Sequence, residues 1–158
     1  MALVTGETKE AFDRKEMKKR GHLDKKPEYG GSHRPVTEEG GAARLHDLVS
    51  AFGEDIYGKN AEQYFGTGDK NLDRKTLAVL HSVRGKPNAM VSAFRAVPKT
   101  AEQKELNKGD WVTVNKDYAK QHGEGTLGSQ YKIIEHRVPA SHLTTNADSF
   151  HEQGYHPK

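Results

Sequence analysis

The chain has 158 residues, a third of them hydrophobic, and its 25 Lys and Arg residues outnumber its 22 Asp and Glu residues by three. This length suits one domain rather than two, and no stretch approaches the roughly 20 apolar residues needed to cross a bilayer. With no cysteine, a disulfide scaffold, a thiolate zinc site and a cysteine nucleophile are excluded. The first residues lack a basic segment followed by an apolar one, so we expect no secretory signal and a soluble, cytoplasmic protein.

The first 41 residues are predicted to form a flexible basic leader and linker. Residues 9–26 contain eight Lys and Arg residues and four acidic ones, a local charge of +4, and residues 21–41 are rich in Pro and Gly. Such a basic run either attracts nucleic acid through a salt-dependent field or is simply a solvated surface. The folded domain is expected over residues 42–158.

The spacing of apolar residues predicts helices in the first half of this domain. Over residues 42–52, apolar side chains recur at helical intervals: Leu45, Leu48, Val49 and Phe52. Asn60 is a candidate N-cap for a short helix. The clearest helix covers residues 73–84 and is expected to end at Gly85, because glycine is common just beyond a helix terminus.

Beyond residue 88 the apolar period changes from 3.6 to 2, which predicts strands. The segments are residues 89–97, 110–114 and 130–138, and the tail after residue 140 is expected to add one or two more. Arg95 is a charged residue in the middle of the otherwise apolar first strand. Helices followed by strands indicate an α+β domain rather than a doubly wound one.

The segment Gly123-Glu124-Gly125-Thr126-Leu127-Gly128 matches the letters of the dinucleotide-binding motif G-x-G-x-x-G. That motif works where a strand delivers the loop to a helix N-terminus. Here a predicted helix over residues 116–122, capped by Asn115, precedes the loop, and a predicted strand follows it. We therefore interpret the glycine-rich run as a flexible connector.

Nine histidines invite a metal hypothesis, and four of them lie near the C-terminus: His136, His142, His151 and His156. No pair among these four has the i, i+4 spacing of the H-E-x-x-H motif, so we expect surface or hydrogen-bonding histidines and no metal. A nucleophilic serine on a G-x-S-x-G turn is also missing from the sequence.

Three segments in order carry a more specific signal. Arg95 lies mid-strand, Thr113 and Asn115 follow on a second strand that leads into a helix, and Glu152 lies in an aromatic, glycine-bearing stretch. This order resembles the mono-ADP-ribosyltransferases of the Arg-Ser-Glu type. More narrowly, residues 44–157 resemble the ADP-ribosyltransferase-like domain of polyvalent proteins from phages and mobile elements. The matching runs are Leu45-His46-Asp47-Leu48, Asp55-Ile56-Tyr57-Gly58, Tyr64-Phe65-Gly66-Thr67-Gly68, Phe94-Arg95-Ala96-Val97-Pro98 and Gly109-Asp110-Trp111-Val112-Thr113.

The resemblance implies a fold in which helices precede a small split β-sandwich that encloses an NAD cleft. It implies transfer of ADP-ribose from NAD to a macromolecular acceptor, protein or nucleic acid, with release of nicotinamide and without a metal. A phage-encoded protein of this kind would act in the host cytoplasm or in the virion.

The resemblance also assigns roles to individual residues. Arg95 would hold phosphate or ribose oxygens of NAD through its planar guanidinium. The backbone of Ala96 would bind the nicotinamide amide, and Thr113 would orient Arg95 or Glu152. Asn115 stands where the family has its later Ser. Glu152 would bond the ribose 2′-hydroxyl and stabilise the cation-like ribose.

Trp111 and Tyr118 are candidates for stacking on the nicotinamide. Phe150 stands where many arginine-modifying relatives carry Glu or Gln, which favours another acceptor or plain NAD hydrolysis. Each residue also has a structural alternative: an ion pair for Arg95, an ordinary strand position for Thr113, a helix cap for Asn115 and a solvated position near the terminus for Glu152. For the whole protein, the alternatives are a catalytically inactive NAD-binding or interaction module and an accessory protein that binds nucleic acid through residues 9–26.

Overall fold

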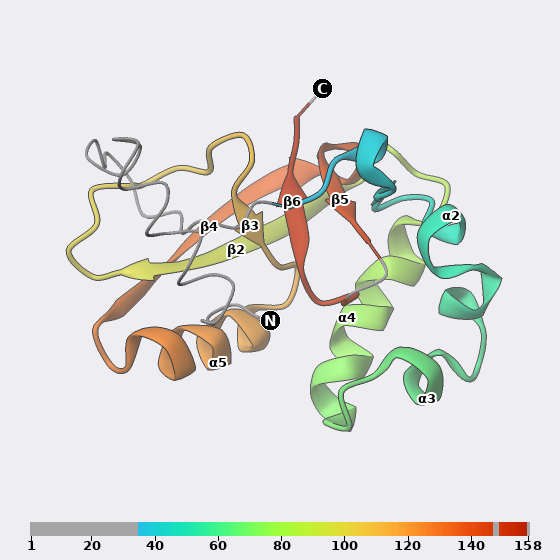
Figure 1. Cartoon of the computed structure of the whole chain (residues 1–158), viewed down its shortest axis with the longest axis horizontal. Coiled ribbons are helices and arrows are strands. Elements are labelled where there is room, and N and C mark those ends of the chain that lie inside the picture. Colours follow the sequence, from blue (N-terminus) through green and yellow to red (C-terminus); the bar gives the residue numbers. More distant parts are fainter. Residues whose placement is uncertain (1–34, 147–148, 158) are drawn as a thin grey trace.

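The computed structural model describes residues 35–146 and 149–157, so the basic run over residues 9–26, and all of the predicted leader before residue 35, lie outside the described part of the chain. Short helices dominate the first half of this part (Figure 1). They are a 3₁₀ helix over Glu38–Gly40, α2 (Val49–Phe52), a 3₁₀ helix over Glu54–Tyr57, α3 (Ala61–Phe65) and α4 (Lys70–Val83).

The helix predicted over residues 42–52 is wrong in its first half. Residues Ala43–Arg44 form a strand, β1, that pairs with Thr145 and Thr144, and only Val49–Phe52 are helical. The amide of Leu45 continues this pairing by donating to the carbonyl of Leu143 at 2.9 Å. Tertiary pairing therefore overrides the helical spacing of the apolar residues, although Leu45 is fully buried as expected.

Helix α4 confirms the clearest helical prediction. It starts three residues earlier than expected because the side chain of Asp69 caps it by accepting a hydrogen bond from the amide of Leu72. It ends just before Gly85, whose φ of +73° is a left-handed conformation that favours glycine. The inward face of the helix carries Leu72, Thr76, Leu80 and Val83.

The strands form two antiparallel sheets, which confirms the α+β class. Strands β2 (Met90–Pro98) and β4 (Tyr131–Pro139) pair over their full length. A four-stranded sheet has the order β1-β5-β6-β3, where β3 is Trp111–Val112, β5 is Leu143–Thr145 and β6 is Gln153–Tyr155. An isolated bridge between Phe94 and Thr113 joins β2 to the end of β3 and so connects the two sheets.

The connector predicted at residues 123–128 is wrong, because helix α5 runs from Lys116 to Leu127 and includes most of the glycine-rich run. The reason lies in its packing on β4 (Figure 1). Gly123 is buried so close to the ring of Tyr131 that a Cβ there would lie 2.7 Å from Cδ2. Glycine therefore lets the helix approach the sheet, and the run is no phosphate-binding loop.

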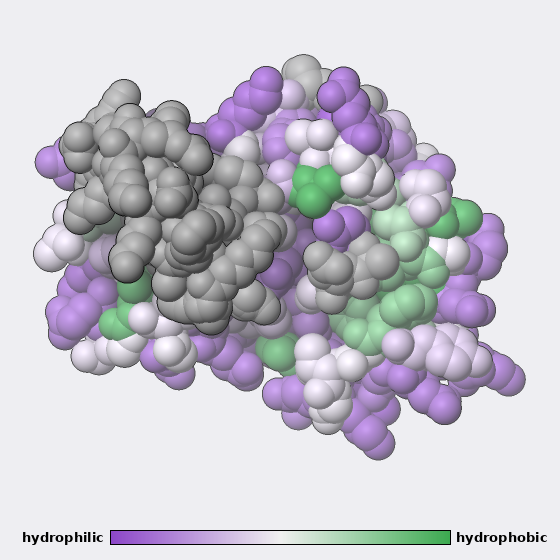
Figure 2. Space-filling model, viewed as in Figure 1, coloured by the Kyte–Doolittle hydropathy of each residue, from purple (hydrophilic) through white to green (hydrophobic). Residues whose placement is uncertain are grey.

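The core lies between the helices and the sheets, and its largest fully buried hydrophobic side chains are Leu45, Leu48, Ile56, Leu80, Leu143 and Phe150. Packing begins before residue 42, since Pro35 is buried beside Gly154 and the carbonyl of Val36 accepts a hydrogen bond from Thr144. In Figure 2, hydrophilic residues line much of the rim of the face shown, and hydrophobic residues gather on its right, around α2. Within the described residues, no helix is both long and apolar enough to span a membrane.

Candidate functional site

The site predicted from the sequence maps to the junction where β2, β3 and β6 meet. The amide and carbonyl of Phe94 pair with those of Thr113 at 2.7 and 2.9 Å. Val112 pairs with Gln153, so Thr113 and Glu152 occupy adjoining positions at the end of the same two strands. Because side chains alternate along a strand, these two leave the sheet on one face. Continuing the register of β3 and β6 by one further pair would place Thr113 opposite Glu152.

Arg95 follows Phe94 on β2 and leaves the strand on the opposite face. Its side chain is 6% exposed and donates to the carbonyl of Trp111 at 3.1 Å. Its Nε lies 3.7 Å from the carboxylate of Asp110, which also accepts from the side chain of Gln103 at 2.7 Å. Arg95 thus forms a buried ion pair, which was its structural alternative. Its partners are Asp110 and Trp111, whereas the carboxylate of Glu152 bonds Tyr118.

Glu152 is held by Tyr118, which lies in the first turn of α5. The Tyr118 hydroxyl donates to Oε2 of Glu152 at 2.5 Å, and its ring stacks on His151 with centroids 4.7 Å apart. Burial, followed by the negative charge of Glu152, raises the pKa of Tyr118 well above its ordinary value. The hydroxyl therefore remains a donor across the neutral and alkaline range.

A buried polar cluster lies behind Tyr118 and ties it to α4. The imidazole of His151 bonds Asp73 through Nε2 and Thr76 through Nδ1, each at 2.8 Å. Since a carboxylate only accepts, Nε2 carries the proton and Nδ1 accepts from the Thr76 hydroxyl. Burial lowers the pKa of His151 in spite of Asp73, so the imidazole is neutral. Burial alone would raise the pKa of Asp73, but hydrogen bonds from His151 and Thr67 lower it.

The chain Thr76–His151–Asp73 has the connectivity of a hydrolase triad without its accessibility. Thr76 is fully buried, and its hydroxyl oxygen already accepts from the side chain of Asn115 at 2.9 Å. A substrate carbonyl has no route to that oxygen. The cluster is therefore a structural link between α4 and the turn before Glu152.

Asn115 acts as the N-cap of α5. Its Oδ1 accepts from the amides of Asp117 and Tyr118, and its Nδ2 donates to the carbonyl of Leu72 and to Thr76. Asn115 is 4% exposed, so all these contacts are internal. In the structure Asn115 therefore has the role that was its structural alternative, the cap of a helix.

His122 is a member of this neighbourhood that the sequence did not assign. Burial lowers its pKa, while the charge of Glu152 raises it and the charge of Arg95 lowers it. Both charged groups therefore act on one imidazole, although they face different partners. The available sequence signal is spacing, since His122 follows Tyr118 by one helical turn.

Ala96 and Trp111, the remaining predicted site residues, are half-buried and lie on the strands that form this junction. Ala96 pairs with Ile133 on β4, and Trp111 pairs with Gly154 on β6. By strand alternation Trp111 shares the face of Thr113. Among the residues that the structure describes, no group of three acidic or histidine side chains is placed to hold a metal ion.

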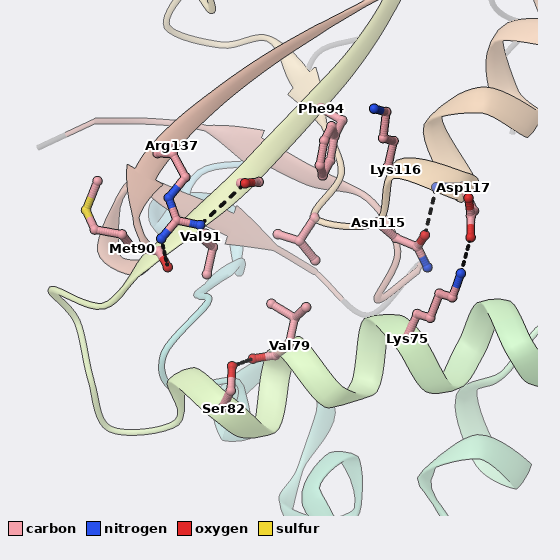
Figure 3. Close-up of a pocket in the computed structure, with 12 residues that line it drawn as sticks. Lys75, Val79, Ser82, Met90, Val91, Phe94, Asn115, Lys116, Asp117 and Arg137 are labelled. Carbon is pink, nitrogen blue, oxygen red and sulfur yellow. Dashed lines mark hydrogen bonds and ion pairs between the residues drawn. The ribbon is translucent and has the colours of Figure 1, made fainter.

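A cleft of about 460 Å³ lies between α4, β2 and the start of α5 (Figure 3). Its apolar walls include Val79 and Phe94, and Lys75 forms an ion pair with Asp117 at its edge. A second cleft, of about 610 Å³, lies at the start of α4 beside Lys70. Neither is lined by the three residues predicted to be catalytic: Arg95, Thr113 and Glu152.

No protein-family model, curated protein or solved structure matches the chain.

Proposed function

We propose that this protein is a mono-ADP-ribosyltransferase that transfers ADP-ribose from NAD to a macromolecular acceptor and releases nicotinamide. The observation that carries the proposal is the adjoining position of Thr113 and Glu152, beside the strand that bears Arg95. These are the three residues whose order along the chain resembles the Arg-Ser-Glu family. In this proposal the two sheets flank NAD as a split β-sandwich.

The proposed reaction is a displacement at the anomeric carbon of the nicotinamide ribose. The bond from C1′ to the ring nitrogen breaks, and its electron pair neutralises the positive charge of the nicotinamide. The ribose passes through a cation-like state that the carboxylate of Glu152 stabilises. A nucleophilic atom of the acceptor then bonds C1′ and loses its proton to solvent. NAD is the substrate, and no metal is required.

The contacts of Arg95 define how it would take part. Asp110 and the carbonyl of Trp111 fix the plane of its guanidinium before a ligand arrives. Ligand oxygens would compete with Asp110 for the positive charge. In the same proposal Ala96 binds the nicotinamide amide through its backbone and Trp111 stacks on the nicotinamide ring.

The packing of Phe150 supports an acceptor other than arginine. Phe150 is 1% exposed and belongs to the hydrophobic core. An apolar, buried side chain cannot activate a guanidinium acceptor in the way that the Glu or Gln of arginine-modifying relatives would. The acceptor is therefore proposed to be another protein side chain or a nucleic acid, and water would give NAD hydrolysis.

One observation favours a second candidate, an inactive NAD-binding or interaction module of the same fold. The ion pair with Asp110 already engages the guanidinium of Arg95. A module that used Arg95 only to hold β2 against the loop that leads into β3 would have the same geometry. Accessory binding of nucleic acid through residues 9–26 is a separate alternative, which deletion of residues 1–34 tests directly.

The test of the proposed function is nicotinamide release from NAD by the full-length chain, in the presence of a cell lysate that supplies acceptors. Glu152→Gln is expected to reduce release by about 100-fold or more, because it removes the charge that stabilises the cation. Its melting temperature should stay close to that of the wild type. The matched control is Glu135→Gln, an exposed position on β4, which should release nicotinamide at the wild-type rate.

Labelled NAD separates the acceptors, since label enters protein, RNA or DNA, or remains in free ADP-ribose. A wild-type protein that releases no nicotinamide would overturn the transferase proposal. In that case, a melting temperature that rises with NAD would indicate a binding module, and an unchanged one would indicate an interaction module.

A further inference from the structure

The carboxylate of Glu152 is bonded by the Tyr118 hydroxyl, and two further parts of the chain support that tyrosine. Tyr118 of α5 donates to Oε2, His151 lies directly before Glu152, and α4 anchors His151 through two hydrogen bonds. None of these contacts follows from strand pairing. They form a continuous path from α4 to one carboxylate oxygen.

We propose that Tyr118 is a positioning residue for Glu152, which it holds in a fixed orientation through its hydroxyl. The inference rests on the proposed function, in which Glu152 is the carboxylate that faces the ribose. It changes the role expected for Tyr118 from the sequence. A ring that already stacks on His151, with an interplanar angle of 10°, has one face occupied before nicotinamide could approach.

The position of the Tyr118 hydroxyl is determined at both ends of the side chain. At the backbone end, the amide of Tyr118 donates to the Oδ1 of Asn115, which fixes the first turn of α5. At the ring end, His151 is locked by Asp73 and Thr76, both of which are fully buried. A phenol held in this way loses little further freedom when it binds a carboxylate, so the contact preorganises Glu152.

The backbone of Glu152 is fixed as well. The hydroxyl of Thr145 on β5 lies 2.7 Å from the carbonyl oxygen of Glu152 and 3.0 Å from that of Ser149. With Oε2 bonded to Tyr118, Oε1 is the oxygen we assign to the ribose 2′-hydroxyl. The two carboxylate oxygens therefore have separate tasks: one holds the orientation and the other meets substrate.

Tyr118→Phe tests this role, because it removes the hydroxyl and keeps the ring that stacks on His151. We expect kcat for nicotinamide release to fall about tenfold or more, the scale of one hydrogen bond to a charged group. KM for NAD should stay within about twofold, since the lost contact is to the protein and not to the ground-state substrate. In a Glu152→Gln background the same substitution should cause no further fall.

Tyr57→Phe is the matched control. Its hydroxyl accepts from the amide of Leu48, and its ring lies against His81 and beneath Arg84, so it also loses a structural hydrogen bond. It should lower the melting temperature without changing kcat. Thr76→Val is a second variant, which removes the hydrogen bond from the Thr76 hydroxyl to His151 and leaves Tyr118 and Glu152 unchanged. We expect it to lower kcat less than Tyr118→Phe does.

Three results would overturn the inference. Wild-type kcat in folded Tyr118→Phe would remove the positioning role while leaving the proposed function intact. Equal losses of kcat in Tyr118→Phe and Tyr57→Phe, in step with their melting temperatures, would make the contact merely structural. A wild-type protein that releases no nicotinamide would remove the proposed function, and the positioning role would fall with it.

Discussion

The two ends of α5 are held differently, one by side-chain hydrogen bonds and the other by close packing of its backbone. At the N-terminal end, Asn115 and Tyr118 bond α4 and Glu152 through side chains, most of them buried. At the C-terminal end, the helix contacts β4 where Gly123 has no side chain at all. Gly125, two residues further on, would have open space around a Cβ. The N-terminal end therefore depends on the side chains of Asn115 and Tyr118, whereas the C-terminal end depends on Gly123 having no side chain.

This difference explains where the helix contributes to the candidate site. Directed hydrogen bonds fix orientation, and they occur at the end that touches Glu152. Close backbone packing fixes only how near the helix lies to the sheet, and it occurs beside Tyr131. Substitutions at the two ends should therefore differ in size and even in sign.

The largest effect is expected for Asn115→Ala. The substitution removes the cap of α5 and leaves the buried Thr76 hydroxyl and Leu72 carbonyl without their amide donor. Loss of a cap costs about 1 kcal/mol and an unsatisfied buried group about 1–3 kcal/mol, so the free energy of unfolding should fall by about 3 kcal/mol. Urea unfolding followed by circular dichroism measures it.

Asn60→Ala is the control for that measurement. Asn60 occupies the N-cap position of α3, is exposed and makes no side-chain capping bond. Its replacement should change stability by no more than about 0.5 kcal/mol. If Asn115→Ala lowered the free energy of unfolding no more than Asn60→Ala does, the hydrogen bonds between Asn115 and α4 would contribute nothing to stability.

Acidification should weaken the N-terminal end of α5 next. Burial lowers the pKa of His151 and that of His156, so the folded state binds fewer protons than the unfolded state below the ordinary histidine value near 6.5. Stability therefore rises with pH across this window and is lost as pH falls from 7.5 to 5.5. The lowered pKa of Asp73 adds a loss only at more acidic pH.

Thermal melts at pH 7.5, 6.5 and 5.5 measure this slope. A His151→Gln variant should show a flatter dependence, because one of the two buried histidines no longer titrates. An equal slope in that variant would remove His151 as a source of the effect.

The fold was predictable from the sequence where elements are long and periodic. Strands β2 and β4 lie within one residue of their predicted ranges, and α4 within three. Strand β1 was not predictable, because its two residues are extended only through pairing with β5. The second half of α5 was also missed, since a glycine-rich run normally ends a helix and the partner of Gly123 is known only in three dimensions.

The candidate site was predictable to a similar degree. The grouping of Thr113 with Glu152 comes from the family resemblance and stays a prediction; the structure shows that both residues lie directly beyond the paired Val112 and Gln153. Nothing in the sequence indicates which acid pairs with Arg95 or which hydroxyl holds Glu152. Asp110 pairs with Arg95 and Tyr118 bonds Glu152 only because the loop before β3 and the start of α5 lie against the junction. Such contacts between distant segments leave no local pattern in the sequence.

Gly123→Ala should destabilise the domain, although alanine is the better helix former. A Cβ at this position would lie 2.7 and 2.9 Å from two ring carbons of Tyr131. Overpacking of this kind costs about 1–3 kcal/mol, against a gain in helix propensity of about 1 kcal/mol, so a net loss of about 1 kcal/mol is expected. In a Tyr131→Ala background, where the ring is gone, the same substitution should become neutral or stabilising.

Gly125→Ala is expected to have the smallest effect and the opposite sign. The residue lies inside α5, and nothing beyond the backbone of its own helix lies within 4 Å of the position that a Cβ would take. Alanine then restricts the unfolded chain without a clash, which should raise the free energy of unfolding by about 0.5–1 kcal/mol. A loss of stability in urea unfolding would instead mean that the last turns of α5 are not helical in solution. The sign of this one substitution therefore decides between a helix and the flexible connector that the glycine-rich sequence suggests.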